Sequence, residues 1–231
     1  AMNLDQKIER VKELLHQIES AYAPAALANS LGAEDMVLTD LIAKHAPAIE
    51  IFSLDTGRLP EETYRLLQEI RDCYAVPIAV YFPQARAVEQ YALAQGPNAF
   101  YASVELRKLC CHIRKVEPLR RALDGKHAWI TGLRREQAPT RKNLEETEWD
   151  ADNGLRKFNP LIEWSQADVW SYIYEFRVPY NVLHDKSYPS IGCAPCTRAV
   201  TAEEDVRAGR WWWEDPSGKE CGLHHGKEKV T

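Results

Sequence analysis

The feature that most constrains the fold is an alternation of short apolar runs with longer segments of helical periodicity. The apolar runs are AALANS, IEIFSL, IAVYF and HAWITGL. Between and around them lie segments whose apolar positions recur at helical spacing, such as residues 3–20, AEDMVLTDLIAKHA and residues 61–74. SQADVWSYIYEF is a further predicted helix, with Ser165 as its expected N-cap. Short apolar runs suit buried strands, and strands that alternate with helices pair in parallel. The alternation therefore predicts an α/β fold with a parallel β-sheet flanked by helices.

Length and charge narrow the classes of function. The 231 residues suit one α/β domain, residues 1–210, followed by a mobile C-terminal tail, residues 211–231. The formal net charge of −5 gives no reason to expect a nucleic-acid partner. No apolar run approaches the roughly 18 residues that cross a bilayer, and the charged, amphipathic first residues do not resemble a secretory signal. We therefore expect a cytoplasmic protein without a membrane partner; homo-oligomerisation is compatible with the sequence.

Four of the six cysteines form two close pairs. Cys110 and Cys111 are adjacent in SVELRKLCCHIRKVEPLRRAL, which predicts a helix interrupted near Pro118, while Cys193 and Cys196 form a C-x-x-C loop. In a reducing compartment such pairs favour metal ligation over disulfides. Adjacent cysteines on a helix point about 100° apart, which suits the separate irons of a [4Fe–4S] cluster better than one zinc ion. The spacing favours a metal or cluster site over buried cysteines that act as small hydrophobes, and it leaves zinc as an alternative.

Three polar loops follow predicted strands: NSLGAEDMVL, LDTGRLPEE and TGLRREQAPTR. The first is a Ser-x-Gly turn before a helix, which presents backbone N–H groups to an anion, but it lacks the Gly-Lys-Ser/Thr ending of a Walker A loop. Taken alone, this turn is read more simply as an ordinary connection between a strand and a helix. Because the carboxyl ends of parallel strands meet at one edge of a sheet, the three loops predict a ligand crevice there.

Basic residues lie near both the loops and the cysteine pairs. Arg134, Arg135 and Arg141 follow the last strand, and Lys115 and Arg210 come after the cysteine helix and the C-x-x-C loop, respectively. Guanidinium groups match phosphate and sulfate oxygens, although most surface arginines are simply solvated. For the tryptophan run at residues 211–213, structural packing is favoured over a partner surface or a lid on an aromatic ligand.

In combination and in this order, these motifs resemble the assimilatory adenylyl-sulfate (APS) reductases, the iron–sulfur branch of the phosphoadenylyl-sulfate (PAPS) reductase family. The resemblance extends from about residue 30 to residue 226. It is carried by SLGAED, LDTGRLPEET, KLCCHIRKVEPL, TGLRREQAPTR, FNPLIEWSQADVW, PYNVLHDKSYPSIGCAPCT, GRWWWE and ECGLH.

The resemblance implies an adenine-nucleotide α-hydrolase-like, Rossmann-like fold and specific residue roles. It implies that Cys221, in ECGLH, is the catalytic nucleophile. The residues that it implies as ligands of a [4Fe–4S] cluster are Cys110, Cys111, Cys193 and Cys196. The residues that it implies as contacts of the phosphosulfate are Lys115, Arg141, Arg207 and Arg210, and those implied in the adenosine loops are Ser30, Gly32, Leu54 and Gly132.

The implied activity is the reduction of APS to sulfite and AMP through an S-sulfocysteine on Cys221, in sulfate assimilation toward cysteine. Thioredoxin or glutaredoxin would be the reductant, and PAPS or dual APS/PAPS reduction is the alternative. We expect the glycine- and charge-rich segment KECGLHHGKEKVT to swing between substrate and reductant. In this tail, His224 and His225 are solvated in the simplest interpretation. In the alternative, His224 lies close enough to Cys221 to lower the pKa of its thiol.

Two alternative functions remain open on the sequence alone. An ATP-using adenylyl transferase or pyrophosphatase of related fold would favour an S-G-G-x-D-S loop where this chain has SLGAED. A zinc-stabilised nucleotide-binding module without catalysis would explain the paired cysteines and the crevice, but it would leave Cys221 without a role.

Overall fold

The computed structural model of the chain describes residues 2–138, 141–215, 219 and 223. The chain divides into two compact units, each assembled from segments that are far apart in the sequence. Unit 1 comprises Ala1–Ser53, Glu61–Ala79 and Leu123–Val182; unit 2 comprises Leu54–Pro60, Val80–Ala122 and Leu183–Thr231. The expected tail, residues 211–231, falls within unit 2, and residues 211–215, 219 and 223 of it are described.

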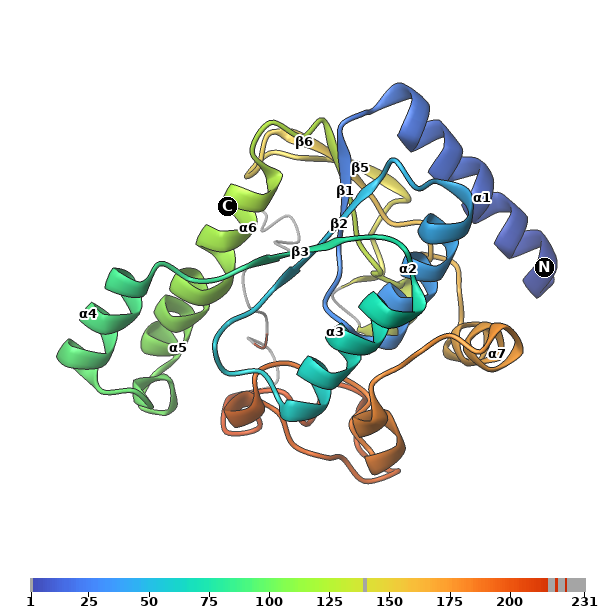
Figure 1. Ribbon diagram of the computed structural model, residues 1–231. Helices are drawn as coiled ribbons and strands as arrows, with labels where there is room; N and C mark the ends of the chain where they lie inside the picture. The colour runs from blue at the N-terminus through green and yellow to red at the C-terminus, as the bar shows by residue number, and fades with distance from the viewer. Residues whose placement is uncertain (1, 139–140, 216–218, 220–222, 224–231) are drawn as a thin grey trace. The chain divides into compact units, whose positions relative to one another are not determined.

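A six-stranded sheet with the strand order β3-β2-β1-β4-β6-β5 organises the fold (Figure 1). Strand β1 pairs in parallel with β2 and β4, and β4 pairs in parallel with β6. The four predicted strands are therefore present, and the α/β class is confirmed. The strand bounds are β1 Ala25–Ala28, β2 Glu50–Leu54, β3 Ile78–Tyr81, β4 Ala128–Ile130, β5 Thr147–Asp150 and β6 Leu155–Phe158.

One edge of the sheet departs from the expected parallel arrangement. Strand β5 pairs antiparallel with β6, so the sheet is mixed. The connecting turn is closed by Asp150, whose carboxylate accepts the backbone N–H groups of Asp152 and Asn153. These two strands were not predicted because they are short and rich in charge. An edge hairpin with one solvated face needs few apolar residues, and Trp149 on it is 58% exposed.

The helices of unit 1 pack their apolar faces on the central strands. Helix α2 is the most deeply placed, because every residue from Met36 to Ile42 is buried. The core also takes residues from β1, β2 and β4 and from the other three helices. Ser165 caps the N-terminus of α7 by accepting the N–H of Asp168, as its sequence position predicts. The helix bounds are α1 Leu4–Ala21, α2 Ala33–His45, α3 Glu61–Cys73 and α7 Gln166–Phe176.

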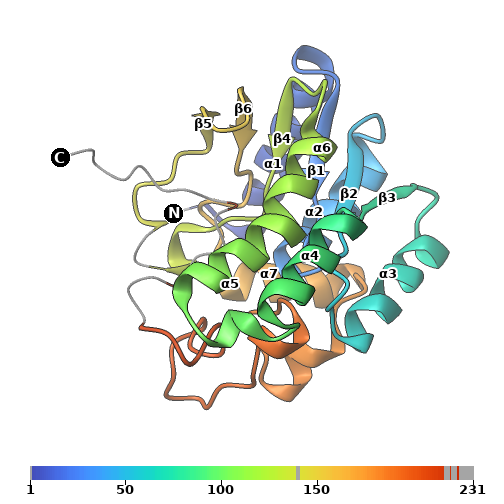
Figure 2. The same ribbon diagram turned by 90° about the vertical axis from the view of Figure 1, so that its left-hand side faces the viewer.

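In unit 2 a helical column contains the adjacent cysteine pair (Figure 2). Helix α5 (Val104–Cys111) continues through a π-helical turn, His112–Val116, into α6 (Glu117–Leu123), and α4 (Ala85–Gln95) lies alongside. The N–H of Glu117 bonds to the carbonyl of His112. The irregularity expected near Pro118 is this π turn, since proline lacks an N–H and its ring would collide with the carbonyl four residues earlier in a regular α-helix.

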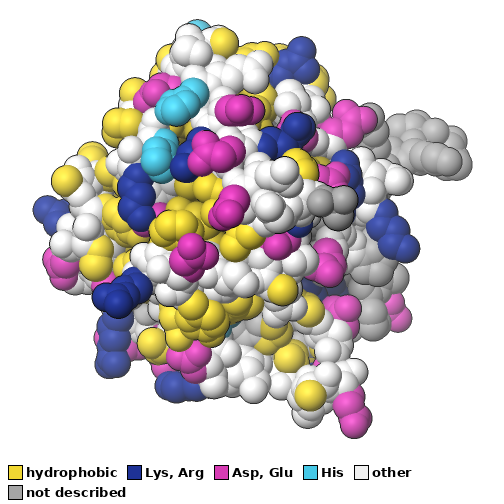
Figure 3. All heavy atoms as spheres, turned by 90° about the vertical axis from the view of Figure 1, so that its right-hand side faces the viewer, with side chains coloured by type: hydrophobic (Ala, Val, Ile, Leu, Met, Phe, Trp, Pro, Cys, Tyr) yellow, Lys and Arg dark blue, Asp and Glu magenta, His cyan; other side chains and the backbone are white. Residues whose placement is uncertain are grey.

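The surface mixes charges of both signs. On the face drawn in Figure 3, acidic, basic and hydrophobic side chains lie interspersed. Among the described residues, none of the helices combines the length and the hydrophobicity that crossing a bilayer would require.

A buried carboxylate ties three helical segments of unit 1 together. Asp40, on α2, is 2% exposed and accepts hydrogen bonds from the hydroxyls of Tyr172 at 2.6 Å and Tyr74 at 2.9 Å, and from Lys44 Nζ at 2.8 Å. Burial and the neighbouring Asp40 charge raise the pKa of both phenols, so both keep their protons and act as donors.

Removing one of these donors should destabilise the fold. We expect Tyr172→Phe to lower the free energy of unfolding by about 1–3 kcal/mol, because the buried carboxylate of Asp40 loses its shortest hydrogen bond. Urea unfolding followed by circular dichroism measures the change. Tyr174→Phe on the same helix is the control, since Tyr174 is 63% exposed; equal stability of the two variants would contradict the role given to Tyr172.

Candidate active site

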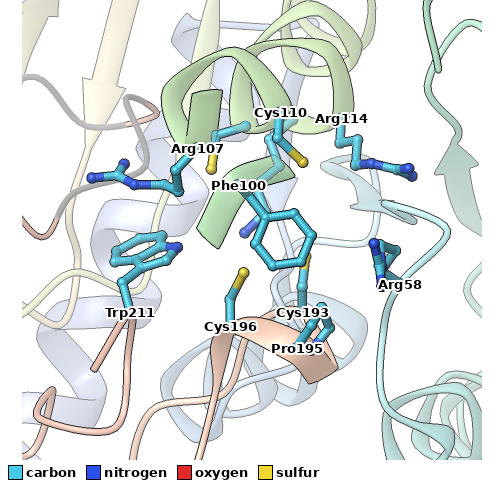
Figure 4. A pocket seen from close by; sticks show the side chains of 11 residues that line it. Arg58, Phe100, Arg107, Cys110, Arg114, Cys193, Pro195, Cys196 and Trp211 are labelled. Carbon is cyan, nitrogen blue, oxygen red and sulfur yellow. The ribbon is translucent and has the colours of Figure 1, made fainter. Parts of the chain in front are cut away.

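The two cysteine pairs line one pocket of unit 2 (Figure 4). Cys110 and Cys111 end helix α5. Cys193 precedes a 3-10 turn that Cys196 ends, and the N–H of Cys196 closes this turn on the carbonyl of Cys193 at 3.0 Å. Cys111, Cys193 and Cys196 are buried, Cys110 is half-buried, and all four are free thiols. Two segments remote in the sequence thus bring four sulfur donors to one cavity, as the motif spacing predicted for a common site.

Aromatic and polar groups complete the walls of this pocket. Phe100 and Trp211, each 1% exposed, pack with the cysteines, and Trp213 packs against the same cluster. Structural packing, the favoured reading of the tryptophan run, is thus the role of Trp211. The hydroxyl of Thr56 lies 3.1 Å from Cys193 Sγ. This contact places the loop after β2, which the sequence singled out as LDTG, at the edge of the cysteine cluster.

Ionising the thiols of this pocket is electrostatically costly. Burial raises the pKa of Cys110, and burial and the nearby Cys193 raise the pKa of Cys196 to about 12. The walls also carry cations, among them Arg114 and Lys115. Four thiolates packed this closely would repel one another, so binding them as thiolates requires a cationic group at their centre.

The donor set fits an iron–sulfur cluster. Thiolates are the usual ligands of such clusters, and four of them surround one cavity here. The indole Nε1 of Trp211 is buried without a hydrogen-bond partner among the described residues, and its nitrogen edge faces the pocket in Figure 4. A guest with sulfur acceptors would satisfy that donor. Within the same residues, no group of three or more His, Cys, Asp or Glu side chains is arranged to hold a single metal ion.

Three of the four predicted phosphosulfate contacts belong to unit 2. Lys115, in the π turn, lines the cysteine pocket. Arg210 is buried and donates to Ser190 Oγ at 3.2 Å, and Arg207 donates to the carbonyl of Lys219 at 3.2 Å. The positive charges of Lys115 and Arg210 counteract part of the rise in the pKa of the Cys196 thiol.

In unit 1 two predicted adenosine residues, Ser30 and Gly132, bond to the carboxylate of Asp35. It accepts the N–H of Ser30 at 2.7 Å and its hydroxyl at 2.6 Å, and it is also bonded by the backbone N–H of Gly132. Gly32 is the N-cap of α2. A Cβ on Gly132 would lie 2.3 Å from Asp35 Oδ1, so glycine is required there. Asp35 therefore fixes the first predicted nucleotide loop to the loop after β4.

The remaining predicted residues are placed as follows. Arg141, in unit 1, is buried and donates to Gln137 Oε1. Leu54, in unit 2, is half-buried at the end of β2. Cys221, His224 and His225 lie outside the described residues.

Sequence reasoning missed several residues that shape these sites: Asp35, Thr56, Arg107, Gly192 and Glu214. An acidic residue in the first turn of a helix, as Asp35 is, ordinarily signals only helix-dipole stabilisation. Arg107 lines the cysteine pocket and forms a buried ion pair with Glu214, but the two residues are distant in the chain, so no local pattern links them. The proximity of Arg107 to the cysteine pair was the one signal in the sequence that could have drawn attention to it.

The buried state of Asp35 predicts a specific pH dependence of stability. Burial raises its pKa to about 6 from an ordinary value of 3.8. The folded chain therefore retains a proton that the unfolded chain has released, and this contribution to stability is lost as the pH rises through 6. Between pH 5 and 7 we expect a loss of about 1 kcal/mol that Asp35→Asn does not share.

Urea unfolding of both proteins across this pH range measures the difference. Asp124→Asn is the control, since Asp124 is exposed and should follow the wild-type profile. Parallel profiles for the wild type and Asp35→Asn would show that Asp35 does not titrate in this range.

Known proteins match this chain along most of its length. The model of the phosphoadenosine phosphosulfate reductase domain family matches residues 24–199. The adenosine 5′-phosphosulfate reductase of Allochromatium vinosum is 55% identical over 212 residues, which is 92% of this chain and 83% of that protein.

Solved structures support the same fold. The phosphoadenylyl-sulfate (PAPS) reductase of Candida auris superposes with a TM-score of 0.71 at 27% identity, covering 87% of this chain and 98% of that one. The FMN adenylyltransferase of Candida glabrata superposes with a TM-score of 0.60 at 15% identity, covering 90% of this chain and 72% of that one, and so supports the fold alone.

Proposed function

Because the chain belongs to the phosphoadenosine phosphosulfate reductase family, we propose that it reduces adenylyl sulfate to sulfite and AMP in sulfate assimilation, toward cysteine. The observation that carries this proposal is the 55% identity to an adenosine 5′-phosphosulfate reductase across 92% of the chain. The convergence of both cysteine pairs on one pocket supports it, since those pairs are the motifs that link the sequence to the iron–sulfur branch. Reduction of PAPS, alone or together with APS, is the second candidate, supported by the PAPS reductase of similar fold.

Substrate binding has two chemical requirements. The adenosine is proposed to bind at backbone groups of the loops that contain Ser30, Gly32, Leu54 and Gly132. The phosphosulfate is anionic, and its oxygens repel an approaching thiolate. Lys115, Arg141, Arg207 and Arg210 are proposed to neutralise that charge and to hold the S–O bond in line with the attacking sulfur.

Reduction is proposed to proceed through the Cys221 thiolate. The thiolate attacks the sulfur of the substrate's sulfate group, and the S–O bond to the nucleotide breaks. AMP leaves with the bonding electron pair on its phosphate oxygen, and Cys221 carries an S-sulfonate.

A reductant with two thiols, of the thioredoxin or glutaredoxin type, completes the reaction. Its thiolate attacks Cys221 Sγ, and sulfite leaves with the S–S bonding pair. The second thiol of the reductant then resolves the mixed disulfide, which becomes the reductant's own disulfide and returns Cys221 as a thiolate. The two electrons thus come from the reductant, which fits a reducing compartment such as the cytoplasm.

The proposed cofactor is a [4Fe–4S] cluster held by Cys110, Cys111, Cys193 and Cys196. When bound, it would supply a positive centre for the thiolates and a fixed support for the residues around the pocket. The residues themselves act on the substrate: Lys115, in the π turn directly after the cysteine pair, directs its charge to the sulfate.

The activity is tested by measuring products. We expect sulfite release from APS with thioredoxin, and no pyrophosphate release from ATP. Slower turnover of PAPS than of APS would exclude PAPS as the preferred substrate, while faster turnover of PAPS would favour PAPS reduction as the activity. With APS labelled in the sulfate, the wild type should retain label covalently when the reductant is omitted, because the S-sulfonate stays on Cys221.

Cys221→Ser should retain no label, since a serine hydroxyl is a far weaker nucleophile than a thiolate. Label remaining on that variant would exclude Cys221 as the nucleophile. Pyrophosphate release from ATP without sulfite release would favour the adenylyl-transferase alternative.

The cofactor is tested independently of activity. After anaerobic purification we expect about four irons and four acid-labile sulfides per chain. Cys193→Ser should lose most of both and the associated visible absorbance, because it removes one of the four ligands. Cys73→Ser is the matched control, since Cys73 is exposed on α3 and does not line the pocket. Stoichiometric zinc without sulfide would contradict the assignment.

A further inference from the structure

The guanidinium of Arg210 occupies a narrow slot in unit 2. Its Cζ lies 4.8 Å from the centroid of the Trp211 indole, within cation–π range, and Nη1 donates to Ser190 Oγ at 3.2 Å. A Cβ added to Gly192 would lie 2.4 Å from Arg210 Nη2 and 2.6 Å from Cζ. The guanidinium therefore packs directly against the backbone of Gly192, and only glycine leaves room for it.

Trp211, whose ring the Arg210 guanidinium contacts, is held by a second arginine. Arg107 Cζ lies 4.7 Å from the Trp211 centroid. Arg107 also forms a bidentate ion pair with Glu214, with Nε–Oε1 and Nη2–Oε2 distances of 2.8 Å and 2.6 Å. The two side chains are 1% and 4% exposed, so losing either partner would leave a buried charge uncompensated.

These contacts form one continuous series within unit 2. It runs from Glu214 through Arg107 and Trp211 to Arg210 and Gly192. Trp211 also lines the cysteine pocket, so the indole that orients Arg210 belongs to the wall around the thiols.

We propose that Gly192 and the Arg107–Glu214 pair are positioning residues that orient the guanidinium of Arg210 toward the phosphosulfate. This inference rests on the proposed function, in which Arg210 binds that anion. A guanidinium is a planar fork that binds a tetrahedral anion along one edge, so its orientation matters as much as its charge. Neither Gly192 nor the ion pair contacts the substrate in this proposal; both act through Arg210.

Gly192→Ala is the sharpest test, because it displaces the guanidinium without removing its charge. The collision falls on the flexible end of a side chain, so the fold should persist. We expect kcat/KM for APS to fall at least tenfold, with unchanged thermal stability and iron content. The affinity for adenosine, which lacks the anionic groups, should stay within twofold of the wild type.

A double-mutant cycle shows whether Gly192 acts through Arg210. In an Arg210→Ala background, Gly192→Ala should cause no further loss, since there is no guanidinium to displace. An equal loss in both backgrounds would overturn the proposal, as would activity of Gly192→Ala within twofold of the wild type.

Glu214→Gln tests the other end of the series. It removes the charge that holds Arg107 while keeping the size of the side chain, and we expect a lower kcat/KM that Glu214→Asp partly restores. Glu204→Gln is the matched control, because it alters the more exposed Arg198–Glu204 pair of the same unit and should leave activity unchanged. Equal effects of Glu214→Gln and Glu204→Gln would contradict the role of the buried pair.

The structural readout separates this inference from the proposed function. Crystal structures of the wild type and Gly192→Ala should show the guanidinium of Arg210 displaced from the slot. If the wild type released no sulfite from APS, the proposed function would fail, while the displacement would still show that Gly192 positions Arg210. An unmoved guanidinium would overturn the inference even in an active enzyme.

Discussion

The chemistry of unit 2 depends on the confinement of four thiols in one buried pocket. Burial opposes ionisation of the Cys110 and Cys196 thiols, and neighbouring cysteines of the pocket oppose it further. The surrounding arginines and Lys115 offset part of that cost. The cost of ionising the thiols therefore explains why the wall of the pocket contains cationic residues. Cations that stabilise thiolates can also neutralise an anion, so the same side chains suit both the proposed cofactor and the proposed substrate.

Unit 1 contains buried carboxylates, and hydrogen bonds compensate for their burial. Its carboxylates, Asp35 and Asp40, are buried and hydrogen-bonded, one at the predicted nucleotide loops and the other among the helices. Asp40 is surrounded by phenols and a lysine, and it contributes to stability. Asp35 accepts backbone N–H groups from two loops, and it fixes the backbone that a nucleotide is proposed to contact. Two carboxylates five residues apart on α2 thus serve packing and site geometry separately.

The features that could be predicted from the sequence are those that have a local pattern of residues. Apolar runs predicted strands β1, β2, β3 and β4, and helical spacing predicted α1, α2, α3, α5, α6 and α7. The β5–β6 hairpin and α4 were missed, since the former is polar and the latter has only Tyr91 buried. The grouping of the cysteines was predictable from their spacing and from the family resemblance. The slot around Arg210 was not, because Gly192, Arg107 and Glu214 come together only in the folded chain.

The π turn between α5 and α6 constrains how the chain can vary in length. Each residue of an α-helix turns the chain by about 100°, so a wide turn of this kind amounts to one residue inserted into an otherwise regular helix. Deleting a residue from His112–Val116 would remove the wide turn and rotate α5 against α6 by about that angle. The cysteine pair and the buried face of Leu119 and Ala122 could then no longer both point inward. Relatives that keep both cysteines at this position should therefore tolerate substitutions in the turn far better than a change in its length.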